Sequence, residues 1–170
     1  INLVTDGLPA LALGVEPAER DVMDRPPYRP NESVFARGMW QHILWVGLLM
    51  GALTFGMQLF SLGRCGQWQT MVFNTLVLAQ VAHVLAIRSD RQSLFRQGLF
   101  SNPWMVAAVL STVGAQLLVL YLPFMQRTFN TQPLSLPQFL ATCGVASLIF
   151  VAVEIEKCCK RRRARARAAA

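Results

Sequence analysis

The stretch GMWQHILWVGLLMGALTFGMQLFSLG, residues 38–63, contains no Asp, Glu, Lys or Arg. A bilayer core about 30 Å thick is crossed by about 20 helical residues, because each residue rises about 1.5 Å. Three further uncharged runs lie at residues 65–87, 97–126 and 128–153. Runs of this length predict four membrane-spanning helices, at about residues 39–62, 70–87, 103–122 and 137–155.

The expected helices are apolar on all sides. A helix of a soluble bundle would carry a polar stripe at helical spacing on its outer face. The segments LVLA at 76–79 and VAAVL at 106–110 leave no room for such a stripe. The chain of 170 residues is 54% hydrophobic and only 15% charged, which excludes an ordinary soluble globule. These features predict an all-α fold, a polytopic transmembrane helix bundle.

The positive charges are grouped on alternate connections. Of the 16 Lys and Arg residues, 14 lie within 15–38, 88–103 and 156–170, and two, Arg64 and Arg127, lie in the other loops. Because Lys and Arg accumulate in cytoplasmic loops, we expect those three segments to be cytoplasmic. The chain then divides into a partial transmembrane helix at 1–14, a cytoplasmic loop at 15–38, four transmembrane helices at 39–156 and a basic cytoplasmic tail at 157–170.

Several partner classes are excluded by the same patterns. Basic residues confined to loops do not make a nucleic-acid-binding surface, so no nucleic acid partner is expected. The four cysteines, Cys65, Cys143, Cys158 and Cys159, have no CxxC or Cys/His spacing, so neither a zinc site nor a disulfide scaffold is indicated. For the basic tail, two interpretations stay open: binding of anionic lipids, or a simple stop at the cytoplasmic face.

Asp6 is the one acidic residue inside an apolar stretch, apart from Glu154 and Glu156 at the end of the last predicted helix. A carboxylate at membrane depth costs about 3 kcal/mol on insertion scales, so it indicates a function or a charged partner. Asn2, Thr5 and Asp6 stand at i, i+3 and i+4, which places their oxygens on one helical face. Converging hard oxygen atoms suit a hard cation such as Ca²⁺.

Pro9 adds a backbone oxygen to this face. It has no N–H to donate to the carbonyl of Thr5, and Gly7 loosens the same turn. We expect a proline-broken turn whose carbonyl faces an ion, as in the broken helices of transporters. The alternative is a kinked helix whose Asp6 pairs with a Lys or Arg outside this sequence. Because the first residues lack a basic n-region and a small-residue cleavage site, we also expect the sequence to begin within a helix of a longer protein.

A longer pattern contains these residues. The string NLVTDGLPALALG at 2–14, followed by EPAERDVMDRPP at 16–27 and NESVFARG at 31–38, resembles the sixth membrane helix and the next cytoplasmic loop of calcium-transporting P-type ATPases. The likeness is to bacterial members similar to the sarcoplasmic-reticulum type. SDRQSLFRQGLFSNPW at 89–104 resembles the loop between their eighth and ninth helices. The chain as a whole is thus similar to part of helix six and helices seven to ten.

The resemblance implies a site and a mechanism. The parent would transport Ca²⁺ through an aspartyl-phosphate intermediate, with Asn2 and Asp6 as ion ligands and Thr5 as a ligand of the second site in two-site pumps. Gln80 takes the position of a coordinating Glu on the eighth helix. Because a neutral amide is a weaker ligand than a carboxylate, we expect one ion per cycle, as in secretory-pathway or plasma-membrane-like pumps. The remaining ligands would lie on the fourth and fifth helices, outside this sequence.

Two polar residues of the second predicted span have an alternative interpretation. The amide of Gln80 could instead form a hydrogen bond between helices. His83, one turn further on the same face, is expected to be a packing partner rather than a proton-countertransport group.

The resemblance also sets the expected partners and the limits of the chain. The parent would be a multi-pass protein of a bacterial plasma membrane, and Mg-ATP would be used by cytoplasmic domains outside this sequence. A phosphorylation motif such as DKTGT has no counterpart here, so we expect no ATPase activity from this polypeptide alone. Its partners would be helices one to five, the cytoplasmic domains and membrane lipids. Two other functions stay open: a P-type pump for Mn²⁺, Na⁺ or a proton, and a stand-alone membrane or lipid-binding helical module in which Asp6 is incidental.

Overall fold

The structure, a computed structural model, is all-helical over the residues it describes. These are residues 2–17, 39–64, 66–89, 94 and 98–168, and for 2–6, 99, 163–165, 167 and 168 the description stops at the backbone. The elements are α1 (Asn2–Gly14), α2 (Met39–Ser61), α3 (Trp68–Ile87), the 3₁₀ turn η2 (Leu99–Ser101), α5 (Pro103–Tyr121), α6 (Pro123–Phe129) and α7 (Leu136–Ala168). Four of them, α2, α3, α5 and α7, are long and apolar enough to cross a membrane. The predicted helical bundle with four spans is confirmed.

Three of the predicted spans begin and end within two residues of the observed ones, namely α2, α3 and α5. The start of α5 shows why. Pro103 occupies the first turn, where its missing N–H is not needed, and the side chain of Asn102 accepts a hydrogen bond from the backbone N–H of Met105. At the other end Leu122 is extended, as the residue before a proline prefers, and Pro123 starts α6.

The last helix differs from the prediction. We expected it to end near Ile155, but α7 continues through the basic tail to Ala168. Lys157 pairs with Glu154 at 3.1 Å and Lys160 with Glu156 at 2.7 Å, at spacings of three and four residues. Such pairs stabilise a helix, and the Ala, Arg and Lys residues that follow are strong helix formers. The charge run predicts a basic tail after the last span, and its residue types also favour continued helix.

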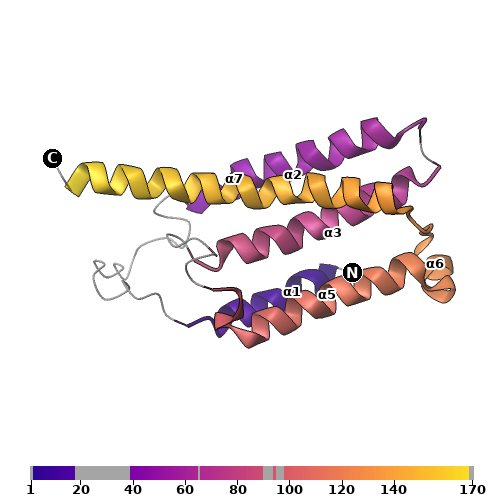
Figure 1. Cartoon of the computed structure of the whole chain (residues 1–170), viewed down its shortest axis with the longest axis horizontal. Helices are drawn as coiled ribbons and strands as arrows, with labels where there is room; N and C mark the ends of the chain where they lie inside the picture. Colours follow the sequence, from indigo (N-terminus) through magenta and orange to yellow (C-terminus); the bar gives the residue numbers. More distant parts are fainter. Residues whose placement is uncertain (1, 18–38, 65, 90–93, 95–97, 169–170) are drawn as a thin grey trace.

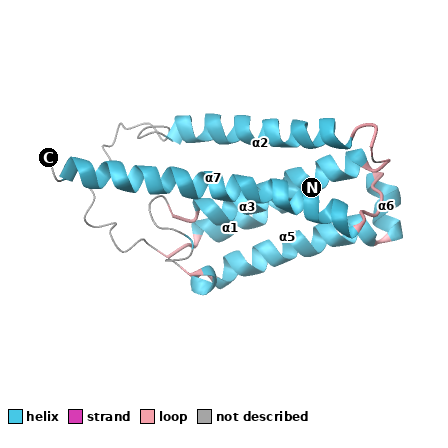
Figure 2. Cartoon of the chain, turned by 45° about the horizontal axis from the view of Figure 1, so that its top comes forward, coloured by secondary structure: helices cyan, strands magenta, loops and turns pink. Residues whose placement is uncertain are grey.

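Helix α3 lies at the centre of the bundle (Figure 1), with α2 and α7 on one side and α1 and α5 on the other. Of its most apolar window, 44% of the residues are buried, against 11% for α2. The helices are nearly aligned with one another, as Figure 2 shows from a second direction. Helices α1, α3 and α7 finish at one end of the bundle, where α2 and α5 begin; we call this the basic end.

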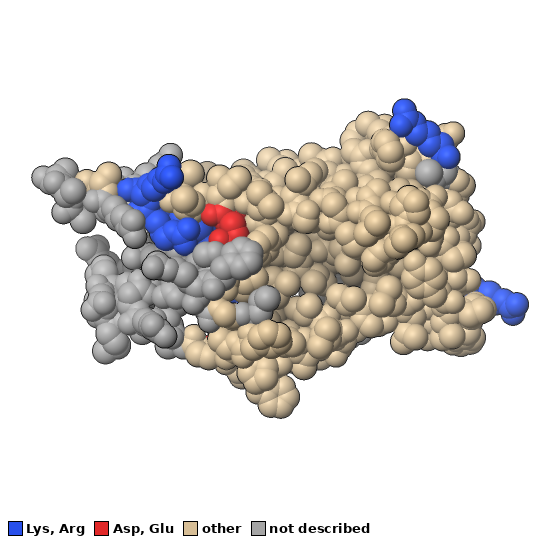
Figure 3. Space-filling model, in the orientation of Figure 1, with Lys and Arg blue, Asp and Glu red and all other residues tan. Residues whose placement is uncertain are grey.

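The outer surface between the two ends is apolar. Large apolar side chains such as Leu48, Leu59 and Leu110 are more than 60% exposed. On the face drawn in Figure 3, the described Lys, Arg, Asp and Glu side chains lie toward the two ends and leave an uncharged band between them. An uncharged band bounded by charge is the surface expected of a protein that crosses a membrane.

Candidate ion site

Helix α1 contains the predicted ligands Asn2, Thr5 and Asp6. Their backbone is helical, and their side chains lie outside the described residues. The helix runs without interruption through Pro9, so the expected proline-broken turn is not observed. Pro9 still has no N–H for the carbonyl of Thr5. Its ring is fully buried, which fixes this turn of α1 against the bundle.

Gln80, the fourth predicted ligand, lies on α3 and is half-buried. Its Oε1 atom is buried and has no hydrogen-bond partner among the described residues. The alternative role that we considered, an interhelical hydrogen bond of the Gln80 amide, is thus not served by this oxygen within that part of the chain. A buried amide oxygen without a donor is costly, which is the condition under which a cation becomes a favourable neighbour.

The depth of Gln80 follows from a contact at the basic end. Arg88 of α3 forms an ion pair with Glu16, which follows α1, and both helices finish at that end. Gln80 precedes Arg88 by eight residues, which is about 12 Å along the axis. Asp6 precedes Gly14, the last residue of α1, by eight residues, or about 12 Å. Gln80 and Asp6 therefore lie at comparable depths, on two helices that are in contact.

Thr112 is a residue that sequence reasoning missed. It lies on α5, the helix that packs against α1 around Ala12 and Met105. Its side chain is 1% exposed, and its Oγ1 atom also has no hydrogen-bond partner among the described residues. A threonine within an apolar run carries no sequence signal of this kind. Over the described ranges, three or more His, Cys, Asp and Glu side chains nowhere gather in a way that could hold a metal ion.

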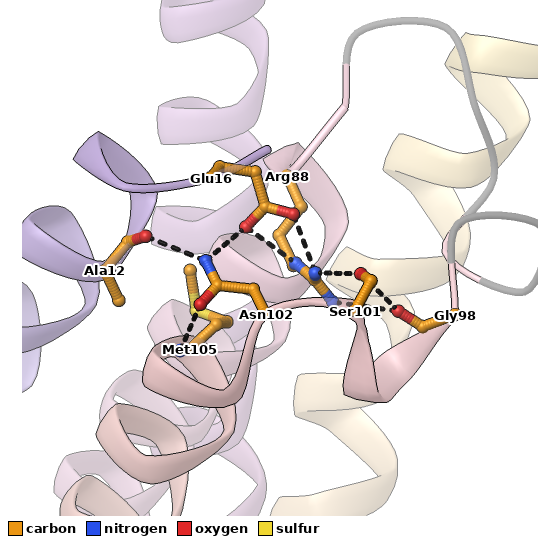
Figure 4. Close-up of polar contacts among 7 residues, drawn as sticks. All are labelled: Ala12, Glu16, Arg88, Gly98, Ser101, Asn102 and Met105. Carbon is orange, nitrogen blue, oxygen red and sulfur yellow. Dashed lines mark hydrogen bonds and ion pairs between the residues drawn. The ribbon is translucent and has the colours of Figure 1, made fainter. Parts of the chain in front are cut away.

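A cluster of polar side chains lies at the basic end, beside α1 (Figure 4). We call it the anchor, and it consists of Glu16, Arg88, Ser101 and Asn102. The Arg88 side chain is 1% exposed and that of Glu16 is 10% exposed. Arg88 donates through Nη2 to Glu16 Oε1 at 2.7 Å and through Nε to Glu16 Oε2 at 3.2 Å. From the sequence alone, Arg88 is expected to be only one of the charged residues of a cytoplasmic loop. Arg88 directly follows an uncharged run, and Glu16 follows α1. These two positions are the sequence features that could have indicated an ion pair at the end of the helices.

A second polar group joins α2, α3 and α7 near the same end. His42 Nδ1 lies 2.7 Å from Glu156 Oε2, and His42 Nε2 lies 3.4 Å from His83 Nε2. His83 therefore has the interhelical hydrogen-bonding contact that a lone histidine inside a membrane commonly makes, in agreement with its predicted packing role.

Comparison with known proteins gives the family. A family model described as "Cation transporting ATPase, C-terminus" matches residues 1–159. The chain is 38% identical over 152 residues to "Calcium-transporting ATPase" of Bacillus subtilis (strain 168), covering 87% of this chain and 17% of that protein. It is 34% identical over 166 residues to "Calcium-transporting ATPase type 2C member 1" of Homo sapiens, covering 96% of this chain and 18% of that protein.

A third relative agrees: "Calcium-transporting ATPase type 2C member 2" of Rattus norvegicus is 32% identical over 176 residues, covering 99% of this chain and 18% of the relative. The chain thus spans less than a fifth of the length of these relatives. With the matched family, the four apolar spans and the all-helical bundle in agreement, the chain belongs to the cation-transporting P-type ATPases, as their C-terminal membrane region.

Proposed function

We propose that this chain is the C-terminal membrane part of an ATP-driven pump that exports Ca²⁺, and that α1 and α3 supply part of its ion site. The observation that carries the proposal is the buried Oε1 of Gln80, which has no hydrogen-bond partner among the described residues and lies at a depth comparable with that of Asp6. The relatives support the choice of ion, because each is named as a calcium-transporting ATPase. Ca²⁺ is bound by several oxygen ligands, and two adjacent helices can supply them together.

The proposed ligands have distinct roles. The Asp6 carboxylate supplies the negative charge. Asn2 and Gln80 supply amide oxygens, and Thr5 supplies a hydroxyl oxygen, as further ligands from this chain. Because Gln80 brings no charge, the site on this chain carries a single carboxylate, which favours one ion per cycle. The other ligands and the Mg-ATP-dependent phosphorylation belong to parts of the protein outside this chain.

The surroundings of the bundle fit the proposed parent. Gly47 and Gly51 of α2 are exposed, and no other helix of the described bundle lies within 4 Å of the position that a Cβ would take on either, so another helix of the pump can approach closely there. The basic end faces the cytoplasm of a bacterial plasma membrane in this proposal, because α1, α3 and α7 finish there and 14 of the 16 Lys and Arg residues lie in sequence segments 15–38, 88–103 and 156–170. The basic part of α7 is then placed to meet anionic lipid headgroups.

Substitution of Asp6 tests the proposal in the complete pump. Asp6→Asn removes the charge and keeps the size of the side chain. We expect the Ca²⁺ concentration for half-maximal phosphorylation from ATP to rise by at least about 100-fold, because ligand charge sets Ca²⁺ affinity over orders of magnitude. As a control, Glu156→Gln makes the same chemical change at the basic end, where we expect less than about a twofold effect. Unchanged Ca²⁺ dependence in Asp6→Asn, or stimulation by Mn²⁺ and not by Ca²⁺, would contradict the proposal.

Gln80 is tested separately. We expect Gln80→Leu to raise the half-maximal Ca²⁺ concentration about tenfold, as loss of a neutral partner of a metal site commonly does. Gln58→Leu, in a half-buried glutamine of α2, is the matched control and should leave that concentration unchanged. Binding of ⁴⁵Ca²⁺ to the wild-type pump should reach one ion per phosphorylation site. Two ions per site, or equal effects of the two glutamine substitutions, would speak against Gln80 as a ligand of a single site.

A further inference from the structure

Three segments far apart in the chain meet at the anchor. Glu16 follows α1, Arg88 follows α3, and Gly98, Ser101 and Asn102 belong to the connection that leads into α5 (Figure 4). Besides its two contacts to Glu16, Arg88 donates to Ser101 Oγ at 2.7 Å and to the carbonyl of Gly98 at 3.3 Å. Gly98 has a φ of 87°, a left-handed conformation that glycine adopts without strain, and this conformation presents its carbonyl to the guanidinium.

Asn102 ties the same point to the last turn of α1. Its Nδ2 donates to the carbonyl of Ala12 at 2.9 Å and to Glu16 Oε2 at 2.7 Å, while its Oδ1 caps α5. The carbonyl of Ala12 is among the last four of α1, which have no partner within the helix. One amide therefore terminates α1 and starts α5. The end of α1 is held by directed hydrogen bonds as well as by apolar contact.

Directed hydrogen bonds of this kind fix the axial position and the rotation of α1 relative to α3. A slip of one residue would move α1 by about 1.5 Å and rotate it by about 100°. An oxygen at about 2.4 Å from Ca²⁺ cannot follow such a displacement and remain a ligand. Buried ion pairs contribute little net stability compared with apolar packing, and register between elements is their best-supported use.

We infer that Arg88 and Glu16 are positioning residues of the ion site, which hold α1 at the depth where the Asp6 carboxylate and the Gln80 amide can serve the same ion. This inference rests on the proposed function. Arg88 acts through Glu16 and touches no ion itself, because about 12 Å of helix separates it from Gln80. The anchor would therefore set the Ca²⁺ affinity of the pump from outside the site.

The test compares Ca²⁺ affinity with stability in the complete pump. The variants are Glu16→Gln, Arg88→Lys, Arg88→Gln and the double variant Glu16→Gln/Arg88→Gln. The control is Thr142→Val, which removes the hydroxyl that accepts a buried hydrogen bond from Asn74, between α7 and α3 and away from α1. For each, we would measure the Ca²⁺ concentration for half-maximal phosphorylation from ATP and the midpoint of thermal unfolding without Ca²⁺.

We expect the single anchor variants to raise the half-maximal Ca²⁺ concentration about tenfold, as partners that orient metal ligands commonly do. Arg88→Lys should not restore the affinity, since an ammonium group cannot make the two-pronged contact. The effect of the double variant on the half-maximal Ca²⁺ concentration should be smaller than the product of the two single effects, because both single variants weaken the contact between Glu16 and Arg88. Thr142→Val should lower the unfolding midpoint and leave the Ca²⁺ requirement within about twofold.

Two results would overturn the inference: unchanged Ca²⁺ dependence in the anchor variants, or shifts that follow the unfolding midpoint in all variants, Thr142→Val included. If Arg88→Gln does not accumulate in the membrane, Glu16→Gln, which keeps its size, and Arg88→Lys, which keeps its charge, decide the question. Asp6→Asn separates the two proposals. Loss of Ca²⁺ dependence there with normal anchor variants refutes only the positioning role, whereas retained Ca²⁺ dependence in Asp6→Asn refutes the proposed function.

Discussion

Asn74 shows how single polar residues hold helices together inside this bundle. Its side chain is fully buried on α3, and it donates to Thr142 Oγ1 of α7 at 2.7 Å and accepts from Gln116 Nε2 of α5 at 3.0 Å. In an apolar medium no water can replace these partners. The three residues therefore join three helices through one amide, with both of its polar atoms satisfied.

Removal of this amide should weaken the bundle. For Asn74→Ala we expect the free energy of unfolding to fall by about 1 to 2 kcal/mol, because two interhelical hydrogen bonds of about 0.6 kcal/mol each are lost along with packing. Unfolding of the purified protein in mixed micelles would measure it. Ser111→Ala is the matched control, since that exposed hydroxyl bonds only to the carbonyl of Ala107 in its own helix. An equal loss in both variants would contradict the role of Asn74.

At the scale of the element, α7 is longer than a membrane requires. Its 33 residues extend about 50 Å, against a hydrocarbon core of about 30 Å. Its apolar membrane-spanning part lies within Leu136–Arg162. The remainder is helical because its residues favour helix, and the pairs of Lys157 and Lys160 with preceding glutamates extend the helix across the boundary. The basic residues that follow the span therefore lie on a helical continuation of α7.

This continuation can be broken locally. In Ala164→Pro, the proline removes a hydrogen bond and clashes with the carbonyl of Lys160, at a cost of about 3 kcal/mol, against about 1 kcal/mol for Ala164→Gly. We expect faster backbone amide exchange at residues 158–168 in the proline variant, a smaller change in the glycine variant, and no change at 136–153. Hydrogen exchange followed by mass spectrometry would resolve these segments. Exchange at the unstructured-chain rate in the wild-type tail would show that α7 ends earlier.

At the scale of the whole molecule, the ends of the bundle differ in charge. The basic end carries the anchor and the basic part of α7, while Arg64 and Arg127 lie at the other end. Trp40 and Trp104 are exposed in the first turns of α2 and α5, where aromatic rings meet the headgroup region. Charge and aromatic rings together define two boundaries and an orientation across the membrane.

Side-specific labelling checks that orientation. In a complete pump without other reactive cysteines, we would compare Cys159, which is exposed on α7, with a cysteine introduced by Arg127→Cys at an exposed position of α6. With intact cells and a membrane-impermeant maleimide, Arg127→Cys should react, and Cys159 should react only after permeabilisation. The opposite pattern would invert the topology, because the positive-inside rule would then fail for this chain.

The anchor and the proposed ion site show how far prediction from the sequence can go. The spacing of Asn2, Thr5 and Asp6 is a local property of one helix, and so was available from the chain alone. The ion pair of Glu16 and Arg88 joins residues 72 positions apart, and no periodicity connects them. Likewise, only the packed helices show that the Gln80 oxygen has no hydrogen-bond partner within the part of the chain that the structure describes.

The amino-acid sequence by itself determined that the chain lies in a membrane. It also determined the four spans and the alternating direction in which they run. They depend on the length of uncharged runs and on the loops that carry Lys and Arg, which are additive properties of short segments. Only the tertiary structure decided that α3 is the central helix, that Asn74 links three helices and that Arg88 is buried. Because each of these helices is apolar on all sides, the hydrophobic pattern cannot determine which helices pack together. The neighbours of each helix are determined instead by the shape of the side chains and by a few directed polar contacts.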